Sequence, residues 1–190
     1  MSNKYIFDKN IKGIDFSEKG IEKGDYENCN FDNCNFLKSN LSDFVFEDCN
    51  FANCDFSNVK ITNTAFKNIQ FKNCKLIGLQ FDECNPFLLG FHFTECILNY
   101  SSFYNLKIKG TKFSHCSLHE VDFTDTDLLG ASFIECDFSG AMFMGTNLQK
   151  ADFRTSNNFS INPDQNQITG AKFSLQNLPG LLDKYKITIE

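Results

Sequence analysis

The sequence predicts an all-β solenoid, and three regularities of the chain indicate it. A large apolar residue recurs at every fifth position, the position two before it is small or β-branched, and asparagine or glycine recurs two after it. Neither an α-helix nor an ordinary β-strand has a period of five. A short fixed period is typical of a solenoid, in which each repeat buries its apolar face by stacking on its neighbours.

The repeat is most regular near the C-terminal end. Its central residues there are Phe113, Leu118, Phe123, Leu128, Phe133, Phe138, Phe143, Leu148 and Phe153. The same phase extends back to Leu88, and an earlier phase runs from Phe16 to Phe81. Of the 23 phenylalanines, 17 are central, so we expect these rings to stack in a column along a narrow core.

The two phases meet in residues 84–88. Phe81 and Leu88 are seven residues apart, so two extra residues lie near Pro86 and Phe87. Proline cannot donate a hydrogen bond to a β-ladder, which favours a bulge or corner loop here. Two interpretations of Phe87 stay open: it folds over the edge of the core, or it projects as a contact point.

We divide the chain into three parts. Residues 14–153 form the repeats. Residues 1–13 form an N-terminal cap, because Lys4 and Lys9 occupy positions that a repeat would bury. Residues 154–190 form a C-terminal cap that covers the open end of the solenoid.

The C-terminal cap is expected to contain a loop, a short helix and a strand. Apolar residues recur at helical spacing from Leu175 to Tyr185, with Asn177 as the expected N-cap and Pro179 in the first turn. Residues 187–189 are expected to close the chain as a strand.

The five-residue unit resembles the pentapeptide-repeat family. Ala151-Asp152-Phe153 and Cys54-Asp55-Phe56 fit its pattern of a small residue, Asp or Asn, then Phe or Leu. The resemblance implies a right-handed quadrilateral parallel β-helix with four repeats per coil and about seven coils. Each coil then lies about 4.8 Å from the next.

The C-terminal tail is similar to that of the Qnr-type quinolone-resistance members of this family. An Asn-Pro-Asp turn, a Gly before a Lys and an apolar residue, and a Leu-rich helix carry this resemblance. It implies a homodimer joined end to end and a protein partner, DNA gyrase or topoisomerase IV. The expected dimer contacts are Leu178, Leu181, Leu182 and Tyr185.

No cofactor, metal site or catalytic set is expected, and we interpret the protein as a non-enzyme. The sequence has no nucleotide-binding loop, zinc-protease motif or nucleophile elbow. Eight of the nine cysteines fall two before a central position, and Cys84 keeps that place only in the earlier phase. They are therefore interpreted as small buried thiols in a reducing compartment, the cytoplasm. No apolar run is long enough to cross a membrane.

The charges are unevenly distributed. The net charge is −6, and no Lys or Arg lies between Lys112 and Lys150. With four repeats per coil, the acidic residues of this interval form an acidic band on one flank of the rod: Glu120, Asp122, Asp125, Asp127, Glu135 and Asp137. The band would repel nucleic acid but could enter a basic groove built for DNA. Alternatively, Asp before the central residue belongs to the repeat and keeps the rod in solution.

Two functions follow from these observations. The first is an acidic DNA mimic that binds a type II topoisomerase and modulates or protects it. The second is a rigid scaffold or adaptor for another protein, because a fold alone does not define a function.

Overall fold

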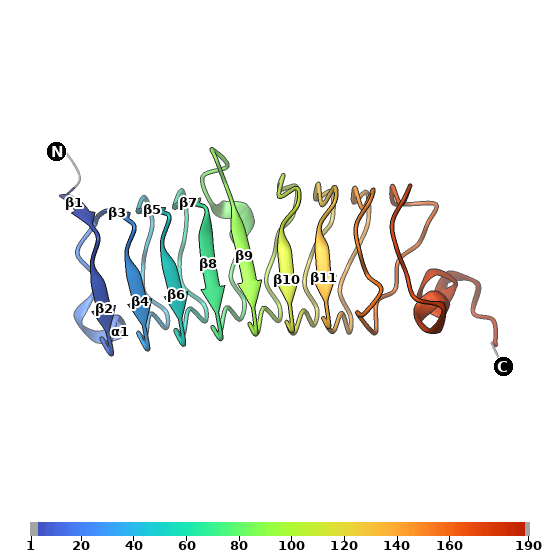
Figure 1. Cartoon of the computed structure of the whole chain (residues 1–190), viewed down its shortest axis with the longest axis horizontal. Helices are drawn as coiled ribbons and strands as arrows, with labels where there is room; N and C mark the ends of the chain where they lie inside the picture. Colours follow the sequence, from blue (N-terminus) through green and yellow to red (C-terminus); the bar gives the residue numbers. More distant parts are fainter. Residues whose placement is uncertain (1–3, 189–190) are drawn as a thin grey trace.

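The computed structural model describes residues 4–188, which form an elongated rod with strand β1 (Lys4–Phe7) at one end and the C-terminal cap at the other (Figure 1). All strand pairs are parallel, and partners lie 20 residues apart, as in Ile6 with Tyr26 and Ile11 with Phe31, except between β8 (Ile69–Lys72) and β9 (Phe91–Thr94), where they lie 22 apart. The fold is the expected right-handed quadrilateral parallel β-helix of about seven coils. The family resemblance therefore predicted the fold class correctly.

Each coil has four faces, which we number in chain order. The first face carries a four-stranded sheet of β1 (Lys4–Phe7), β3 (Gly24–Glu27), β5 (Val45–Glu47) and β7 (Ala65–Lys67). The second face carries a seven-stranded sheet of β2 (Asn10–Lys12), β4 (Asn30–Asp32), β6 (Asn50–Ala52), β8 (Ile69–Lys72), β9 (Phe91–Thr94), β10 (Lys112–Ser114) and β11 (Ser132–Ile134). Isolated parallel bridges connect the coils on the third face, for example Ser117 with Asp137, and on the fourth, for example Ser102 with Asp122. The first face is opposite the third, and the second is opposite the fourth.

The core is the predicted column of central side chains. The rings of Phe31, Phe51, Phe71 and Phe93 stack on successive coils, with centroids 4.7, 5.3 and 5.5 Å apart. Rings on adjacent faces meet edge to face, as Phe31 and Phe36 do with centroids 5.8 Å apart. Both geometries are favourable for aromatic pairs, which adds to the gain from burial.

In most repeats, the residue two positions after the central residue forms a corner of the coil, and its backbone has a positive φ in the left-handed region. Asn33, Asn53 and Asn73 have φ of 54°, 56° and 50° on one corner of three successive coils. Asparagine and glycine tolerate this conformation best, which explains their recurrence.

The position two before the centre accepts small or β-branched residues, and those with a hydroxyl or thiol can donate a hydrogen bond to the preceding coil. The Thr126 hydroxyl donates to the Phe103 carbonyl of the preceding coil at 2.8 Å. The Cys49 thiol donates to the Tyr26 carbonyl at 3.4 Å. All nine cysteines are free and buried, and burial raises the pKa of Cys49 to about 12.

The insertion lies a few residues after its predicted place. Cys84 is buried and Asn85 pairs with Ala65, so the earlier phase continues through Pro86. Leu88, which we expected at a centre, instead occupies a corner with φ of 57° and is 63% exposed. Proline at the central position does not fill the core, and the buried ring of Phe91 packs against Phe66 instead.

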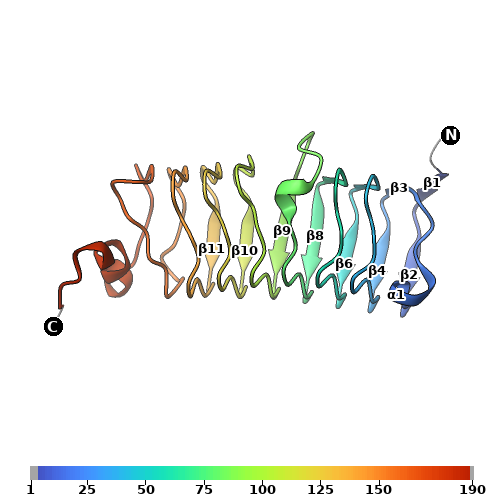
Figure 2. The ribbon, with the colours of Figure 1, turned by 180° about the vertical axis from the view of Figure 1, so that it is seen from behind.

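The loop between the 3-10 helix η1 (Phe81–Glu83) and β9 projects beyond the rod (Figure 2). Phe87 is 67% exposed. It therefore does not fold over the edge of the core, and the interpretation as an exposed side chain holds.

Residues 4–13, which we expected as a cap, form strands β1 and β2 in the same register as the later coils. The short helix α1 (Phe16–Lys19) follows them, with Asp15 as its N-cap accepting from the Ser17 amide at 2.9 Å. Ile6 and Ile11 are partly buried against the core. The lysines of this coil avoid burial because they are exposed at its open end.

The C-terminal cap differs in detail from the prediction. Its helical part is two 3-10 helices, η2 (Leu175–Leu181) and η3 (Asp183–Tyr185), and Ser174 rather than Asn177 precedes the first. The Asn177 amide donates to the Ser156 carbonyl at 2.7 Å, which holds η2 on the last coil. Residues 187 and 188 form no strand, and Ile189 lies outside the described residues.

Candidate protein-binding surface

The six residues of the acidic band occupy two structurally different positions. Asp122, Asp127 and Asp137 directly precede a central residue and are half-buried. Each accepts a hydrogen bond from the backbone amide two residues later, at 2.8, 3.2 and 3.1 Å. These carboxylates therefore stabilise the turn of their own repeat, as Asp and Asn side chains commonly do. Asp before the centre thus has a structural role, whatever else it does.

Basic side chains contact three carboxylates of the band. Lys109 lies 3.2 Å from Asp127, His115 lies 3.2 Å from Glu135, and His119 lies 3.0 Å from Asp137. Lys109 precedes the interval without Lys or Arg, so only the register between coils places it beside the band.

The pKa of the Asp137 carboxyl is lowered by its surroundings. Burial raises the pKa of Asp137, but hydrogen bonds from Asn158, His119 and Ser139 outweigh that effect and lower it to about 2. The Asp137 carboxylate already has hydrogen-bond partners within the protein, so it is less available to a binding partner.

The remaining charge is concentrated on the fourth face. Glu120 and Asp125 are exposed corner residues with φ of 55° and 56° on either side of Asp122. Among residues 4–188, no group makes a hydrogen bond or ion pair with the side chain of Glu120 or Asp125. The acidic band is therefore strongest in one coil of one face.

Exposed apolar residues flank this coil, and our sequence analysis did not find them. Tyr100 and Tyr104 lie one coil before it, and Met142 and Met144 lie one coil after it. The signal was present in the sequence, because residues 20 apart become neighbours on adjacent coils.

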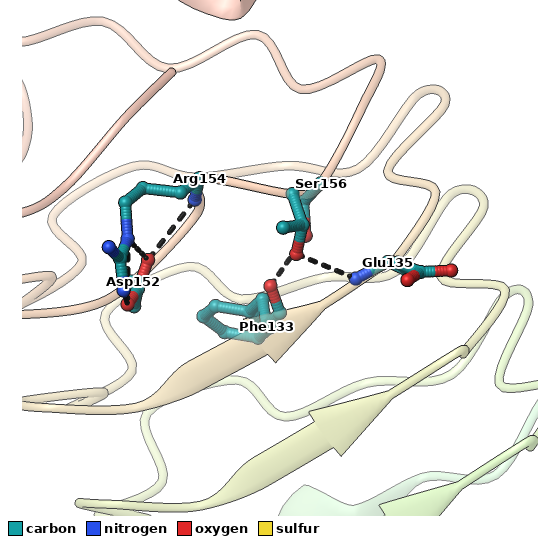
Figure 3. A network of polar contacts seen from close by, with 6 residues as sticks. Phe133, Glu135, Asp152, Arg154 and Ser156 are labelled. Carbon is teal, nitrogen blue, oxygen red and sulfur yellow. Dashed lines mark hydrogen bonds and ion pairs between the residues drawn. The ribbon is translucent and has the colours of Figure 1, made fainter.

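Further along the rod, polar contacts lie within and between the last coils (Figure 3). The Arg154 guanidinium makes three hydrogen bonds of 2.7–3.2 Å to the carboxylate of Asp152. The Ser156 hydroxyl donates to the Phe133 carbonyl at 2.9 Å. The Arg154 charge is thus paired on the second face and does not reach the acidic residues of the fourth.

The four expected dimer contacts are not equivalent. Leu181 is partly buried against the core, so it attaches the cap to the last coil. Leu178, Leu182 and Tyr185 are 38%, 36% and 59% exposed at the end of the rod. These three are available for a second copy.

Neither a metal site nor a membrane span was found in the described part of the chain. Between residues 4 and 188, no three His, Cys, Asp or Glu side chains are placed to share a metal ion. None of the described helices is long and apolar enough to span a bilayer. A shallow cleft of about 390 Å³ lies between the last coil and the cap, lined by residues that include Asn158, Gln176 and Asp183.

A square parallel β-helix with five-residue sides and positive-φ corners defines a class of solenoid proteins. A family model described as the pentapeptide repeat region matches residues 24–88 and 80–153. The chain belongs to the pentapeptide-repeat family. A search of curated protein sequences finds no match.

Several solved structures are similar to this chain. One is a trypsin-treated variant of QnrB1, a plasmid-mediated fluoroquinolone resistance protein. The match spans 100% of this chain and 92% of the QnrB1 chain, at 20% identity and a TM-score of 0.59. Full-length QnrB1 covers 97% with 100% of its own chain, at 18% identity and a TM-score of 0.58. HetL, a pentapeptide repeat protein involved in heterocyst differentiation regulation from the cyanobacterium Nostoc sp. strain PCC 7120, covers 92% with 86% of its own chain, at 15% identity and a TM-score of 0.56. At these identities the likeness concerns the fold.

Proposed function

We propose that this protein is a non-catalytic, cytoplasmic binding protein whose partner is a type II topoisomerase, DNA gyrase or topoisomerase IV. The observation that carries the proposal is a rigid rod with exposed, unpaired carboxylates at Glu120 and Asp125. A narrow anionic rod can enter a basic groove that normally holds duplex DNA, and its charge accelerates the encounter. The buried free thiols support a reducing compartment.

The likeness to QnrB1 supports the choice of partner. QnrB1 is a fluoroquinolone resistance protein, and the Qnr-type resemblance of the C-terminal tail implies gyrase or topoisomerase IV as the partner. A related rod is therefore proposed to modulate or protect these enzymes. Two rods would be joined through Leu178, Leu182 and Tyr185, which doubles the length of the particle.

The proposal is tested by adding the purified protein to gyrase in a supercoiling assay, with and without a quinolone. Either inhibition of supercoiling or protection from the quinolone is expected, together with binding that weakens as salt rises. The double variant Glu120→Gln, Asp125→Asn should lose the effect, whereas Lys112→Gln on the opposite face should keep it. If gyrase and topoisomerase IV neither respond nor bind at low salt, the topoisomerase proposal is wrong.

A rigid scaffold or adaptor for another protein is the second candidate. The observation that favours it is that Asp127, Glu135 and Asp137 already have partners within the rod. The remaining unpaired carboxylates therefore cover a shorter length of the rod than the regularly repeated phosphate charges of DNA would. Recovery of one non-topoisomerase protein by the wild-type chain, and not by the double variant, would support this candidate.

A further inference from the structure

The fourth face exposes apolar side chains on two of its coils. Tyr100 and Tyr104 are 63% and 46% exposed, and Met142 and Met144 are 52% and 56% exposed. Equivalent positions on the intervening coil are occupied by polar residues such as Thr124. Exposed apolar patches with polar surroundings are typical of interaction sites, and tyrosine and methionine are both enriched at protein–protein interfaces.

Carboxylates lie between the two apolar rows. Asp122 bridges to Ser102 on one side and to Met142 on the other, which fixes the order of the three coils. Glu120 and Asp125 mark the corners of the middle coil. Two coil spacings separate the tyrosine row from the methionine row by about 10 Å. This distance suits a single extended segment lying across the face.

The surrounding charge determines which kind of segment fits. On the fourth face, residues 78–83, 100–105, 120–125 and 140–145 contain no Lys or Arg. The opposite second face carries Lys72, Lys112 and Arg154. The field over these four coils of the fourth face is therefore negative, which attracts cationic segments and repels nucleic acid.

We propose that this face, defined by Tyr100, Tyr104, Glu120, Asp125, Met142 and Met144 and called the Tyr–Met face, binds a protein segment that alternates arginine or lysine with apolar residues. The cationic heads pair with Glu120 and Asp125. Their aliphatic stems and the apolar neighbours pack on the methionine thioethers and tyrosine rings, which also favour cations over their faces.

This inference rests on the proposed function, because both require a protein partner and both use Glu120 and Asp125, but it adds two apolar rows and a partner chemistry that the topoisomerase proposal does not name. A DNA mimic needs carboxylates repeated along the rod. The Tyr–Met face instead has one anionic row between two apolar rows, so it selects a partner through side-chain packing as well as charge.

The chain offers an internal reporter for the test, since two of its three methionines lie on this face. Protein labelled with ¹³C at the methionine methyl groups is titrated with a short peptide that alternates arginine and leucine, and methyl NMR signals are recorded. We expect the Met142 and Met144 signals to shift and saturate. The same peptide with glutamate in place of arginine, or glycine in place of leucine, should bind at least about tenfold more weakly, which corresponds to about 1.4 kcal/mol.

Matched variants localise the binding. Tyr104→Ser and the double variant Glu120→Gln, Asp125→Asn should each weaken binding about tenfold. Ile134→Ser, which removes an exposed apolar residue at the corresponding position of the second face, should leave it unchanged. Circular dichroism confirms that each variant is folded, and Asp125→Asn retains a residue type suited to a positive φ.

Several results would overturn the Tyr–Met face. The proposal is contradicted if the peptide leaves the Met142 and Met144 methyl signals unchanged, or if the glutamate peptide or duplex DNA shifts them equally. It is also contradicted if Ile134→Ser weakens binding as much as Tyr104→Ser does. Broadening of the methyl signals with protein concentration alone would identify a second copy as the occupant. A gyrase response that Tyr104→Ser leaves intact would reject this face and keep the topoisomerase proposal. Peptide binding without a gyrase response would support the Tyr–Met face and reject the topoisomerase proposal.

Discussion

The phenylalanine column should be least tolerant of change in the middle of the rod, and Phe123→Ala tests this. Phe123 is fully buried, and its ring lies 5.2 Å from that of Phe103 and 5.3 Å from that of Phe143. Truncating a buried phenylalanine to alanine costs about 3–5 kcal/mol, and more where the cavity cannot collapse. Backbone hydrogen bonds fix the spacing of the coils here, for example from the Phe123 amide to the Met142 carbonyl at 3.0 Å, so the cavity cannot easily collapse. We therefore expect a loss of about 4–5 kcal/mol.

Urea denaturation followed by far-UV circular dichroism and by tyrosine fluorescence measures this loss. With a slope of about 2 kcal/mol per molar urea, the midpoint should fall by about 2 M. Phe87→Ala is the control, because that ring is 67% exposed and its removal should change stability by less than about 0.5 kcal/mol. Coincident transitions by both probes are required, since a solenoid can unfold in sections. A loss below about 1.5 kcal/mol for Phe123→Ala would refute the rigid, closely stacked core.

Three further predictions concern a corner, a carboxylate and the cap. Gly145→Ala should lower the free energy of unfolding, measured by urea denaturation, more than Gly130→Ala does. Both glycines have a positive φ, but only at Gly145 would the added Cβ overlap a side chain, that of Asp125. Equal losses would exclude that contact. The pKa of Asp137 is lowered to about 2, below the ordinary Asp value of about 3.9, so its ionised form stabilises the fold above about pH 4 and this contribution disappears as the pH falls towards 2. Thermal unfolding of Asp137→Asn should consequently depend less on pH in that window, and an unchanged dependence would contradict the assignment. Leu182→Glu should convert a dimer to a monomer in analytical ultracentrifugation, with a far-UV circular dichroism spectrum that still shows a folded β-solenoid. A wild-type protein that is already monomeric would contradict the end-to-end dimer.

The sequence alone determined the repeat and almost everything that follows from it locally. The five-residue period identified the central residues, the small residues that precede them and the corners that follow, because each repeat meets the same steric demands in every coil. It also assigned the cysteines correctly: a position that needs a small side chain accepts Cys, Thr or Ala. Cys84 was the informative case, since it keeps its place only if the earlier phase continues through Pro86.

What the sequence did not determine is which side chains meet across coils. A one-dimensional pattern indicated six acidic residues as a band, but the register brought Lys109 and two histidines against half of them. It also misplaced the start of the second phase, because Leu88 and Phe91 are both plausible core residues and only packing against Phe66 selects the second. The C-terminal cap was similarly ambiguous, since its leucines suit either an α-helix or the 3-10 turns that the last coil requires.

The physical reason for this division is the range of the interactions. Turn geometry and burial at the centre act within five residues, so they can be read along the chain. Pairing of charges and the assembly of tyrosine, carboxylate and methionine into one face act across coil contacts 20 residues apart in sequence, or 22 across the insertion. Only the closed tertiary structure establishes those neighbours.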